Sequence, residues 1–366
     1  MYARLAAIVT IREDVRNAHV AATFFLAEGL LLGMGNPLLD ISAIVDHEFL
    51  KKYDLKSNNA ILAEDKHKPL YDELINLYKA DFIAGGSVQN TMRVAQWFLQ
   101  KPKVATYMGC VGKDKYSEIL EDKATRDGLN VRYQYTDQEP TGTCAVLITG
   151  KDRSLCANLA AANCFSLTHI EKLENKQLID RAEYIYISGF FLTVSPESIL
   201  AMAKHANETD KMFMMNLSAP FLCEFFSGPM LAAMPYVDIL FGNETEADTF
   251  AKVNNFNTTD RKQIALKISE MEKINGKRKR IVVITQGAEA VLVAENGTVT
   301  EYPVVKLSED KVVDTNGAGD AFVGGFLAQL VRRKDVETCV KCGIWAATQI
   351  VQRSGCTYEG KPSFQS

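Results

Sequence analysis

The sequence lacks an excess of charge of either sign. Its 366 residues include 41 basic and 45 acidic side chains, and lysine and arginine form no long block. Nucleic-acid-binding proteins neutralise phosphates with clustered basic residues, so this composition predicts no nucleic-acid partner. A long apolar run is also missing. Residues 20–27 are apolar but far shorter than the roughly 20 residues that span a bilayer, so we expect no membrane partner.

Cysteine and histidine do not occur at metal-binding spacings. The 8 cysteines are scattered through apolar segments, which is typical of reduced core thiols in a cytosolic protein. Cys339 and Cys342 form a single C-x-x-C without a second pair, and the 5 histidines show no ligand spacing. A structural zinc site needs four ligands, so none is predicted. We expect a cytoplasmic protein, with an additional nuclear location left open.

Residues 312–330 contain the most informative pattern, VVDTNGAGDAFVGGFLAQL. Two β-branched residues lead into a turn, and the apolar spacing then becomes that of a helix. Gly317 and Gly319 allow consecutive N–H groups to point into one concavity at the positive end of the helix dipole, where a phosphate can bind. Asp320 adds a carboxylate whose pKa we expect the dipole to lower. This pattern indicates a kinase; the alternative is a plain glycine-rich turn before a buried helix.

The same stretch resembles the C-terminal signature of the ribokinase family of carbohydrate kinases, also called the PfkB type, in which the aspartate after G-A-G is the catalytic base. The resemblance implies that Asp320 is the base and that the amides of Gly317, Ala318 and Gly319 stabilise the developing charge. It also implies ATP and Mg²⁺ as cofactors.

Within that family, residues 29–357 are most similar to members that phosphorylate the 5′-hydroxyl of adenosine to give AMP, a purine-salvage reaction. We expect a monomer, although the sequence does not determine the oligomeric state. The alternatives are a kinase for another nucleoside or a sugar, and a catalytically inactive nucleoside-binding protein.

The hydrophobic pattern predicts an α/β fold. Beyond residue 162, apolar β runs alternate with amphipathic helices, which indicates a doubly wound, mainly parallel sheet flanked by helices. Residues 131–162 instead show short alternating runs between turn residues, as in β-hairpins. With residues 37–84 they predict a small separate sheet, which in ribokinase-like proteins is a lid over the sugar. Residues 29–366 would form this kinase domain, and residues 1–28 an N-terminal extension of undetermined role.

Two segments resemble the parts of the family that hold the sugar. Residues 36–40 end in Asp40, whose carboxylate would accept hydrogen bonds from both ribose ring hydroxyls; a turn cap is the alternative. Residues 84–90, AGGSVQN, open a helix in which Asn90 would bind a ribose hydroxyl. The substrate-binding residues expected in these segments and near the catalytic turn are Asn36, Asp40, Gly85, Gly86, Ser87, Asn90 and Asn316.

An apolar wall is expected at the other end of the substrate. Such a wall suits a purine ring, whereas it would leave the hydroxyl groups of a plain sugar unpaired. The resemblance assigns Phe191 to stacking on adenine, with Phe221 as a weaker candidate. The other apolar candidates are Leu62, Cys144, Leu155, Ala157 and Leu159. Arg153 resembles a lid arginine near the transferred phosphate; a solvated surface arginine is the alternative.

Residues 243–246, NETE, lie at a strand end and match an Asn-x-x-Glu motif of the family. In that motif Asn243 and Glu246 arrange Mg²⁺ largely through water; an ordinary acidic first turn of a helix is the alternative. We expect a helix over residues 336–352 to cover the base of ATP, and some relatives have a histidine where Ile344 stands. The residues expected to contact ATP are Asn243, Thr285, Gln286, Gly287, Ile344 and Thr348.

Overall fold

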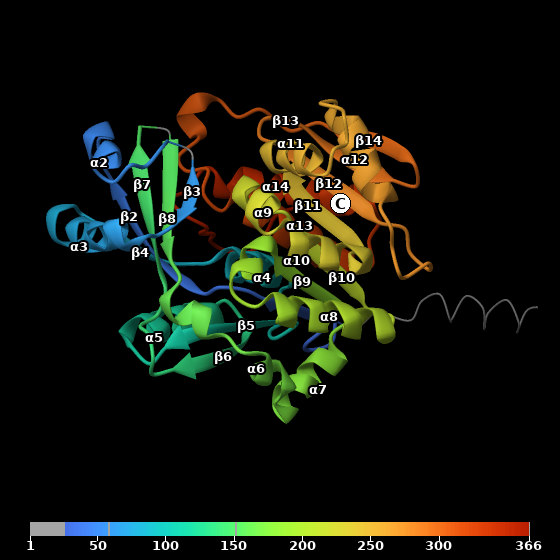
Figure 1. The fold of residues 1–366 in the computed structure, drawn as a ribbon, viewed down its shortest axis with the longest axis horizontal. Helices are drawn as coiled ribbons and strands as arrows, with labels where there is room; N and C mark the ends of the chain where they lie inside the picture. The colour runs from blue at the N-terminus through green and yellow to red at the C-terminus, as the bar shows by residue number, and fades with distance from the viewer. Residues whose placement is uncertain (1–25, 58, 151, 366) are drawn as a thin grey trace, which may run out of the picture.

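The computed structural model describes residues 26–57, 59–150 and 152–365, arranged around two β-sheets (Figure 1). The first 25 residues of the expected N-terminal extension lie outside this range. The larger sheet has nine strands in the order β14-β13-β12-β11-β10-β9-β1-β5-β6. Its strands are β1 (Leu31–Met34), β5 (Ala105–Gly112), β6 (Asn130–Thr136), β9 (Tyr184–Ser188), β10 (Met212–Asn216), β11 (Ile239–Asn243), β12 (Ile281–Gln286), β13 (Glu289–Glu295) and β14 (Thr298–Tyr302).

The larger sheet is mainly parallel and covered on both faces. Every pairing from β12 to β6 is parallel, and only β13 and β14 add an antiparallel edge. Alternate strand residues point to opposite faces, so Tyr186 packs with one core cluster and Ile185 and Ile187 with the other. This confirms the predicted doubly wound α/β fold.

Helices from different parts of the chain pack on each face. One face is covered by α4 (Ser87–Leu99), α5 (Lys115–Arg126), α13 (Ala318–Val331) and α14 (Val336–Ile350). The other is covered by α6 (Leu167–Glu171), α7 (Leu173–Arg181), α8 (Pro196–Glu208), α9 (Pro220–Phe225), α10 (Ser227–Ala233), α11 (Glu244–Val253) and α12 (Arg261–Glu270). Short 3₁₀ helices are η1 (Asp65–His67), η2 (Ala160–Cys164), η3 (Gly189–Thr193), η4 (Met234–Tyr236) and η5 (Glu309–Lys311). Within the described ranges, no helix has the length and apolar character needed to cross a bilayer.

The smaller sheet has five strands in the order β3-β8-β7-β2-β4 and stands beside the larger one (Figure 1). Its strands are β2 (Leu38–Ile44), β3 (Ala60–Leu62), β4 (Asp81–Gly85), β7 (Thr143–Thr149) and β8 (Asp152–Asn158). One face packs against α2 (His47–Lys52) and α3 (Lys68–Leu77). The opposite face contributes Leu38, Cys144 and Val146 to a small separate apolar cluster.

The smaller sheet is built from fewer residues than its predicted boundaries, 37–84 and 131–162. Residues 131–136 belong to β6, which pairs in parallel with β5 of the larger sheet. At this sheet edge most of the side chains of β6 are only partly buried, and Tyr133 and Thr136 are buried. An edge strand with mixed burial has the same sequence pattern as a hairpin strand, which explains why the prediction for this segment was wrong.

Candidate active site

A cavity of about 260 Å³ lies where the carboxyl ends of the parallel strands face the smaller sheet. Asn36 follows β1, Phe190 follows β9 and Ser218 follows β10, and all three line the cavity. Open α/β sheets bind ligands at this edge. The predicted substrate-binding residues that line it are Asn36, Asp40, Leu62, Gly86, Ser87, Asn90, Cys144, Leu155, Ala157, Leu159, Phe221 and Asn316.

The first turn of α13 forms one end of the cavity. The helix begins at Ala318, three residues before the apolar spacing starts, and Gly317 caps it with a φ of +77°. A Cβ atom at Gly317 would lie 2.8 Å from the Cβ of Cys356, so this position has neither the backbone angle nor the space for a side chain. Gly317, Gly319 and Asp320 line the cavity, and their positions fit an anion-binding helix N-terminus.

Asp320 receives two hydrogen bonds from the N-terminal part of α4. Ser87 Oγ donates to one carboxylate oxygen at 2.7 Å, and Asn90 Nδ2 donates to the other at 3.0 Å. Burial raises the pKa of Asp320, while the hydrogen bonds from Ser87 and Asn90 act in the opposite direction. The expected lowering of this pKa by the helix dipole is therefore wrong, because loss of hydration outweighs it.

Asp40 also lines the cavity and is 8% exposed. Its carboxylate occupies the space above Gly85, where a Cβ would lie 2.3 Å from Oδ1. Gly85 itself does not line the cavity, so its absent side chain matters because it makes room for Asp40. Burial, followed by the nearby carboxylates of Asp320 and Asp314, raises the pKa of Asp40 to about 8. No donor from the described residues bonds to this carboxylate, which is arranged to meet a ligand.

The wall formed by the smaller sheet is apolar, as predicted, but the aromatic residue beside it differs. Phe191 is 0% exposed and packs edge-to-face on Phe165 in the core. Its neighbour Phe190 lines the cavity instead. The expected stacking of Phe191 on a ligand is therefore wrong, because the 3₁₀ turn η3 directs adjacent residues to opposite sides. Lining residues outside the predicted set of substrate-binding residues are Leu38, Ala60, Ile61, Ser188, Thr193 and Ser218.

Arg153 is neither at the cavity nor a solvated surface side chain. It is 9% exposed, and its Nε donates to Asp314 Oδ1 at 3.0 Å. A second guanidinium nitrogen donates to the carbonyl of Val313 at 2.5 Å. Arg153 thus connects β8 of the smaller sheet to the loop that leads into α13. In this arrangement it joins the smaller sheet to that loop and lines neither cavity, so its expected place near the transferred phosphate stays a prediction.

A second cavity of about 110 Å³ adjoins the first and shares Ser87, Phe190, Gly319 and Asp320 with it. It is also lined by Asn243, Glu246 and Thr285. Asn243 caps α11, where its backbone N–H and Nδ2 donate to Glu246 and its Oδ1 accepts from the Glu246 N–H. The alternative interpretation, an ordinary first turn of a helix, thus agrees with these contacts. Asn243 and Glu246 also line the cavity and carry side-chain oxygen atoms.

Glu246 has the chemistry of a water-mediated Mg²⁺ ligand. It is 5% exposed, and burial raises its pKa to about 7. A divalent cation nearby would favour its ionised form. Among the described residues no cluster of three or more acidic, histidine or cysteine side chains could hold a metal by itself. Mg²⁺ keeps several waters and uses few protein ligands, so a carboxylate and an amide at a small polar cavity fit this ion.

The remaining residues predicted to contact ATP line neither cavity. Gln286 Nε2 donates to the carbonyl of Ala290, and Gly287 has a φ of +57° in the turn between β12 and β13. Thr348 Oγ1 donates to the carbonyl of Ile344 within α14. Their contacts to ATP stay predictions.

The chain matches the model of the pfkB family carbohydrate kinases over residues 47–363. It is 57% identical to adenosine kinase 2 of Arabidopsis thaliana over 337 residues, which are 92% of this chain and 98% of that protein. It is also 45% identical to adenosine kinase of Dictyostelium discoideum over 327 residues, or 89% of this chain and 96% of that one.

Solved structures agree with these sequence matches. The structure of Anopheles gambiae adenosine kinase in complex with P1,P4-di(adenosine-5) tetraphosphate is similar with a TM-score of 0.91 and 58% identity, covering 92% of this chain and 100% of that one. Adenosine kinase from Schistosoma mansoni in complex with 2-fluoroadenosine has a TM-score of 0.90 at 37% identity, covering 93% and 100%.

Proposed function

The chain belongs to the pfkB family of carbohydrate kinases, and we propose that it is an adenosine kinase, which transfers the γ-phosphoryl group of ATP to the 5′-hydroxyl of adenosine. The observation that best supports this activity is the composition of the 260 Å³ cavity. Polar side chains that can bind a ribose line one part of the cavity, and the apolar face of the smaller sheet forms its wall. An apolar wall suits a purine and would leave the hydroxyls of a plain sugar unpaired.

The polar groups divide into two sets with different tasks. Asp40 would accept hydrogen bonds from the two ribose ring hydroxyls, as its unpartnered carboxylate and the space above Gly85 suggest. Asp320 would take the proton from the 5′-hydroxyl, and Ser87 and Asn90 orient its carboxylate through hydrogen bonds at 2.7 and 3.0 Å. A weak base suffices because the acceptor hydroxyl loses its proton late in a largely dissociative phosphoryl transfer.

The negative charge of the reaction would be met at the N-terminus of α13. The amides of residues 317–319 would bind the transferring phosphoryl group, with no side chain needed. Asn243 and Glu246 would hold Mg²⁺ through water, and the ion would neutralise charge on the phosphates of ATP. Phe190 and Phe221, together with Leu155, Ala157 and Leu159 of the smaller sheet, would contact the adenine.

The smaller sheet would act as a lid. It contributes the apolar wall, and Arg153 ties it to the loop before α13 through the buried pair with Asp314. A lid that excludes water strengthens the electrostatic contacts of a kinase site. We also propose that the protein is a cytoplasmic, monomeric enzyme of purine salvage, which size-exclusion chromatography and cell imaging would test.

A substrate comparison tests the proposed activity. ADP release is measured with ATP, Mg²⁺ and adenosine, inosine, ribose or fructose as the acceptor. We expect turnover with adenosine and far less with ribose or fructose, because neither sugar offers a purine to the apolar wall; inosine measures whether the site also distinguishes between purines. Strong turnover of ribose with none of adenosine would instead identify a sugar kinase.

Replacing the proposed base separates catalysis from binding. In Asp320→Asn we expect the kcat for adenosine to fall by about 10²–10⁴-fold, the usual contribution of a general base. Adenosine binding, measured by calorimetry, should be retained because the amide keeps the shape of the carboxylate. Asp137→Asn, on a surface aspartate that is 74% exposed, is the matched control. Normal turnover by Asp320→Asn would rule out this residue as the base.

A further inference from the structure

A buried arginine lies directly behind the residues that contact the proposed base. Arg93 is on α4, one turn after Asn90, and is 1% exposed. Its Nη1 donates to Asn90 Oδ1 and to the carbonyl of Ala84, each at 3.2 Å, and its Nε donates to Asp127 at 2.6 Å. Its guanidinium also lies 5.7 Å from the ring centroid of Tyr358. None of the candidate functions above involved this side chain.

The contact with Asn90 determines which way the amide of Asn90 points. An arginine can only donate hydrogen bonds, whereas an asparagine amide has one accepting and one donating end. The atom of Asn90 that faces Arg93 must therefore be the oxygen. The NH₂ group is then directed at Asp320, to which it donates at 3.0 Å. With the amide reversed, an oxygen would face the carboxylate of Asp320 and repel it.

The contact with Ala84 fixes the backbone on the ribose side of the cavity. Ala84 directly precedes Gly85 and Gly86, and Gly86 lines the cavity. The next carbonyl, that of Gly85, accepts a hydrogen bond from Gln89 Nε2 at 3.0 Å. Two buried side chains of α4 thus hold successive carbonyls of this segment. Arg93 is the one that also contacts Asn90.

The charged groups around Asp320 come from several elements. Asp40 on β2 interacts electrostatically with Asp320 and with Asp314 in the loop before α13, and Asp314 is paired with Arg153. Glu246 on α11 lines the smaller cavity together with Asp320. Tyr186 on β9 and Cys356 in the C-terminal segment also face it. Burial raises the pKa of both, to about 12 for Cys356, so both are neutral. Arg93 is therefore a buried cation beside this group of acids, and it lowers the pKa of Asp40.

We infer that Arg93 is a positioning residue for phosphoryl transfer. Its guanidinium fixes the amide of Asn90 so that the NH₂ group donates to the ionised carboxylate of Asp320, and it holds the Ala84 carbonyl so that the backbone at Gly86 faces the ribose. Arg93 touches neither substrate and acts through these two groups.

The test compares two buried arginines that differ in location. Arg280 is also 1% exposed, but it donates only to backbone carbonyls at the far edge of the larger sheet. We expect R93M to reduce kcat/KM for adenosine by about 10²-fold per folded molecule, the scale of a misplaced catalytic group. The acidic limb of its kcat–pH profile should move to higher pH, because Asp320 loses a fixed donor. R93K, which restores a cation, should recover part of both effects.

Controls separate positioning from stability. R280M and R280K should lower the melting temperature but leave kcat per folded molecule and the acidic limb unchanged. D127N removes the ion pair with Arg93 and keeps the contacts to Ala84 and Asn90, so it should also lose stability and keep the pH profile. If R93M does not fold, R93K is compared with D127N and R280K in the same assays.

The inference rests on the proposed adenosine kinase activity, and different experimental results would contradict the inference and the activity. A wild-type protein that releases no ADP with adenosine would contradict the activity itself. If the wild type is active and the Arg93 variants keep its pH profile and its kcat per folded molecule, only the role of Arg93 is overturned.

Discussion

At the scale of single residues, the buried carboxylate of Asp40 is suited to binding a ligand but lowers the free energy of unfolding. The carboxylate is 8% exposed, and no donor within the described part of the chain bonds to it. Its pKa rises to about 8 through burial and through the neighbouring carboxylates. A proton that binds more tightly in the folded state than in the unfolded chain makes stability depend on pH.

The sign of this dependence gives the first prediction. The pKa of Asp40 is raised from 3.8 to about 8 on folding, so its contribution to stability is complete below pH 4 and is lost as the pH rises towards 8. Asp40→Asn cannot ionise, and we expect it to raise the free energy of unfolding at pH 8 by about 1–3 kcal/mol, with a smaller gain at pH 5. Urea unfolding at both pH values measures this.

The same substitution should remove adenosine binding. Above pH 8, where Asp40 is ionised, an amide replaces a charged acceptor, and hydrogen bonds to charged groups contribute about 1.5–3 kcal/mol each. Calorimetry with adenosine checks this, with Asp137→Asn as the control for an exposed aspartate.

The stability prediction has its own contrary outcome. If Asp40→Asn is no more stable than the wild type at pH 8, burial of the ionised carboxylate does not destabilise the folded protein.

Single residues also show what the sequence could and could not predict. Asp40, Asn90 and Asp320 were found because motifs define their positions, and the structure brings all three to one cavity. Phe190 was missed in favour of Phe191. Adjacent aromatic residues in a 3₁₀ turn have no periodicity that distinguishes the core side from the cavity side, so only the packing of Phe191 on Phe165 decides.

At the scale of elements, the first turn of α13 contains a glycine, which is a weak helix former, at a position with free space beside it. Gly319 lies inside the helix, and a Cβ atom there would meet no protein atom within 4 Å. Glycine in a helix costs about 0.8–1.0 kcal/mol relative to alanine. Nothing in the packing requires this glycine, so the space beside it is available to a ligand.

Gly319→Ala should therefore change stability and activity in opposite directions. We expect the free energy of unfolding to rise by about 0.5–1 kcal/mol. We also expect kcat for adenosine to fall, because the methyl group would occupy the space where the phosphoryl group approaches the helix amides. Thermal unfolding and ADP release measure the two effects. The control is Gly276→Ala, which is also in open space but lines neither cavity. A stabilised and fully active Gly319→Ala enzyme would contradict the anion site.

Elements with strong periodicity were predicted closely, and those defined by context were not. The sequence pattern predicts strands over residues 143–149 and 184–188 and a helix over residues 244–253. β7, β9 and α11 have these bounds, because their apolar runs end at clear turn or cap residues. β6 was assigned to the wrong sheet, since strand pairing depends on contacts that are distant in sequence. The pKa of Asp320 was predicted from the dipole of one helix, but it depends on burial by several elements.

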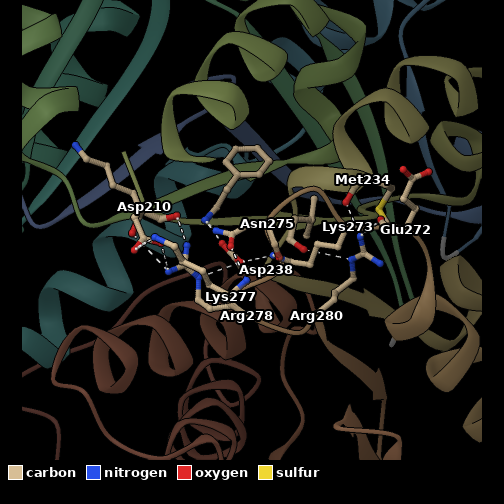
Figure 2. A network of polar contacts seen from close by, with 12 residues as sticks. Asp210, Met234, Asp238, Glu272, Lys273, Asn275, Lys277, Arg278 and Arg280 are labelled. Atoms are coloured by element: carbon tan, nitrogen blue, oxygen red, sulfur yellow. Dashed lines mark hydrogen bonds and ion pairs between the residues drawn. The ribbon is translucent and has the colours of Figure 1, made fainter. Parts of the chain in front are cut away.

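At the scale of the whole molecule, charged groups differ between the two ends of the parallel strands of the larger sheet. Carboxylates beyond the C-terminal ends of the strands line the cavities. At the N-terminal ends, Asp238 is 2% exposed and accepts hydrogen bonds from Lys273 at 2.7 Å and Arg278 at 3.2 Å (Figure 2). It also accepts from the N–H of Phe213 at the start of β10. Beside it, Arg280 donates to several backbone carbonyls, including that of Met234 (Figure 2).

This network connects the starts of three neighbouring strands. Asp238 precedes β11, its partner Phe213 is in β10, and Arg280 precedes β12. Its charged groups bond to one another or to backbone groups, and they line neither cavity. We therefore expect it to contribute stability to the sheet without affecting the chemistry at the opposite ends of the strands.

Two aspartates that share one partner test this expectation. Arg278 pairs with buried Asp238 and also with Asp210, which is 49% exposed. Asp238→Asn leaves cations without their buried counter-charge, and we expect a loss of about 3–5 kcal/mol in the free energy of unfolding. Asp210→Asn should cost only about 0–1 kcal/mol, as for exposed pairs. Urea unfolding gives both values, and KM for adenosine should be unchanged in both folded variants. Equal losses would show that burial does not set the strength of this network, and a changed KM would show that the two ends are coupled through the strands.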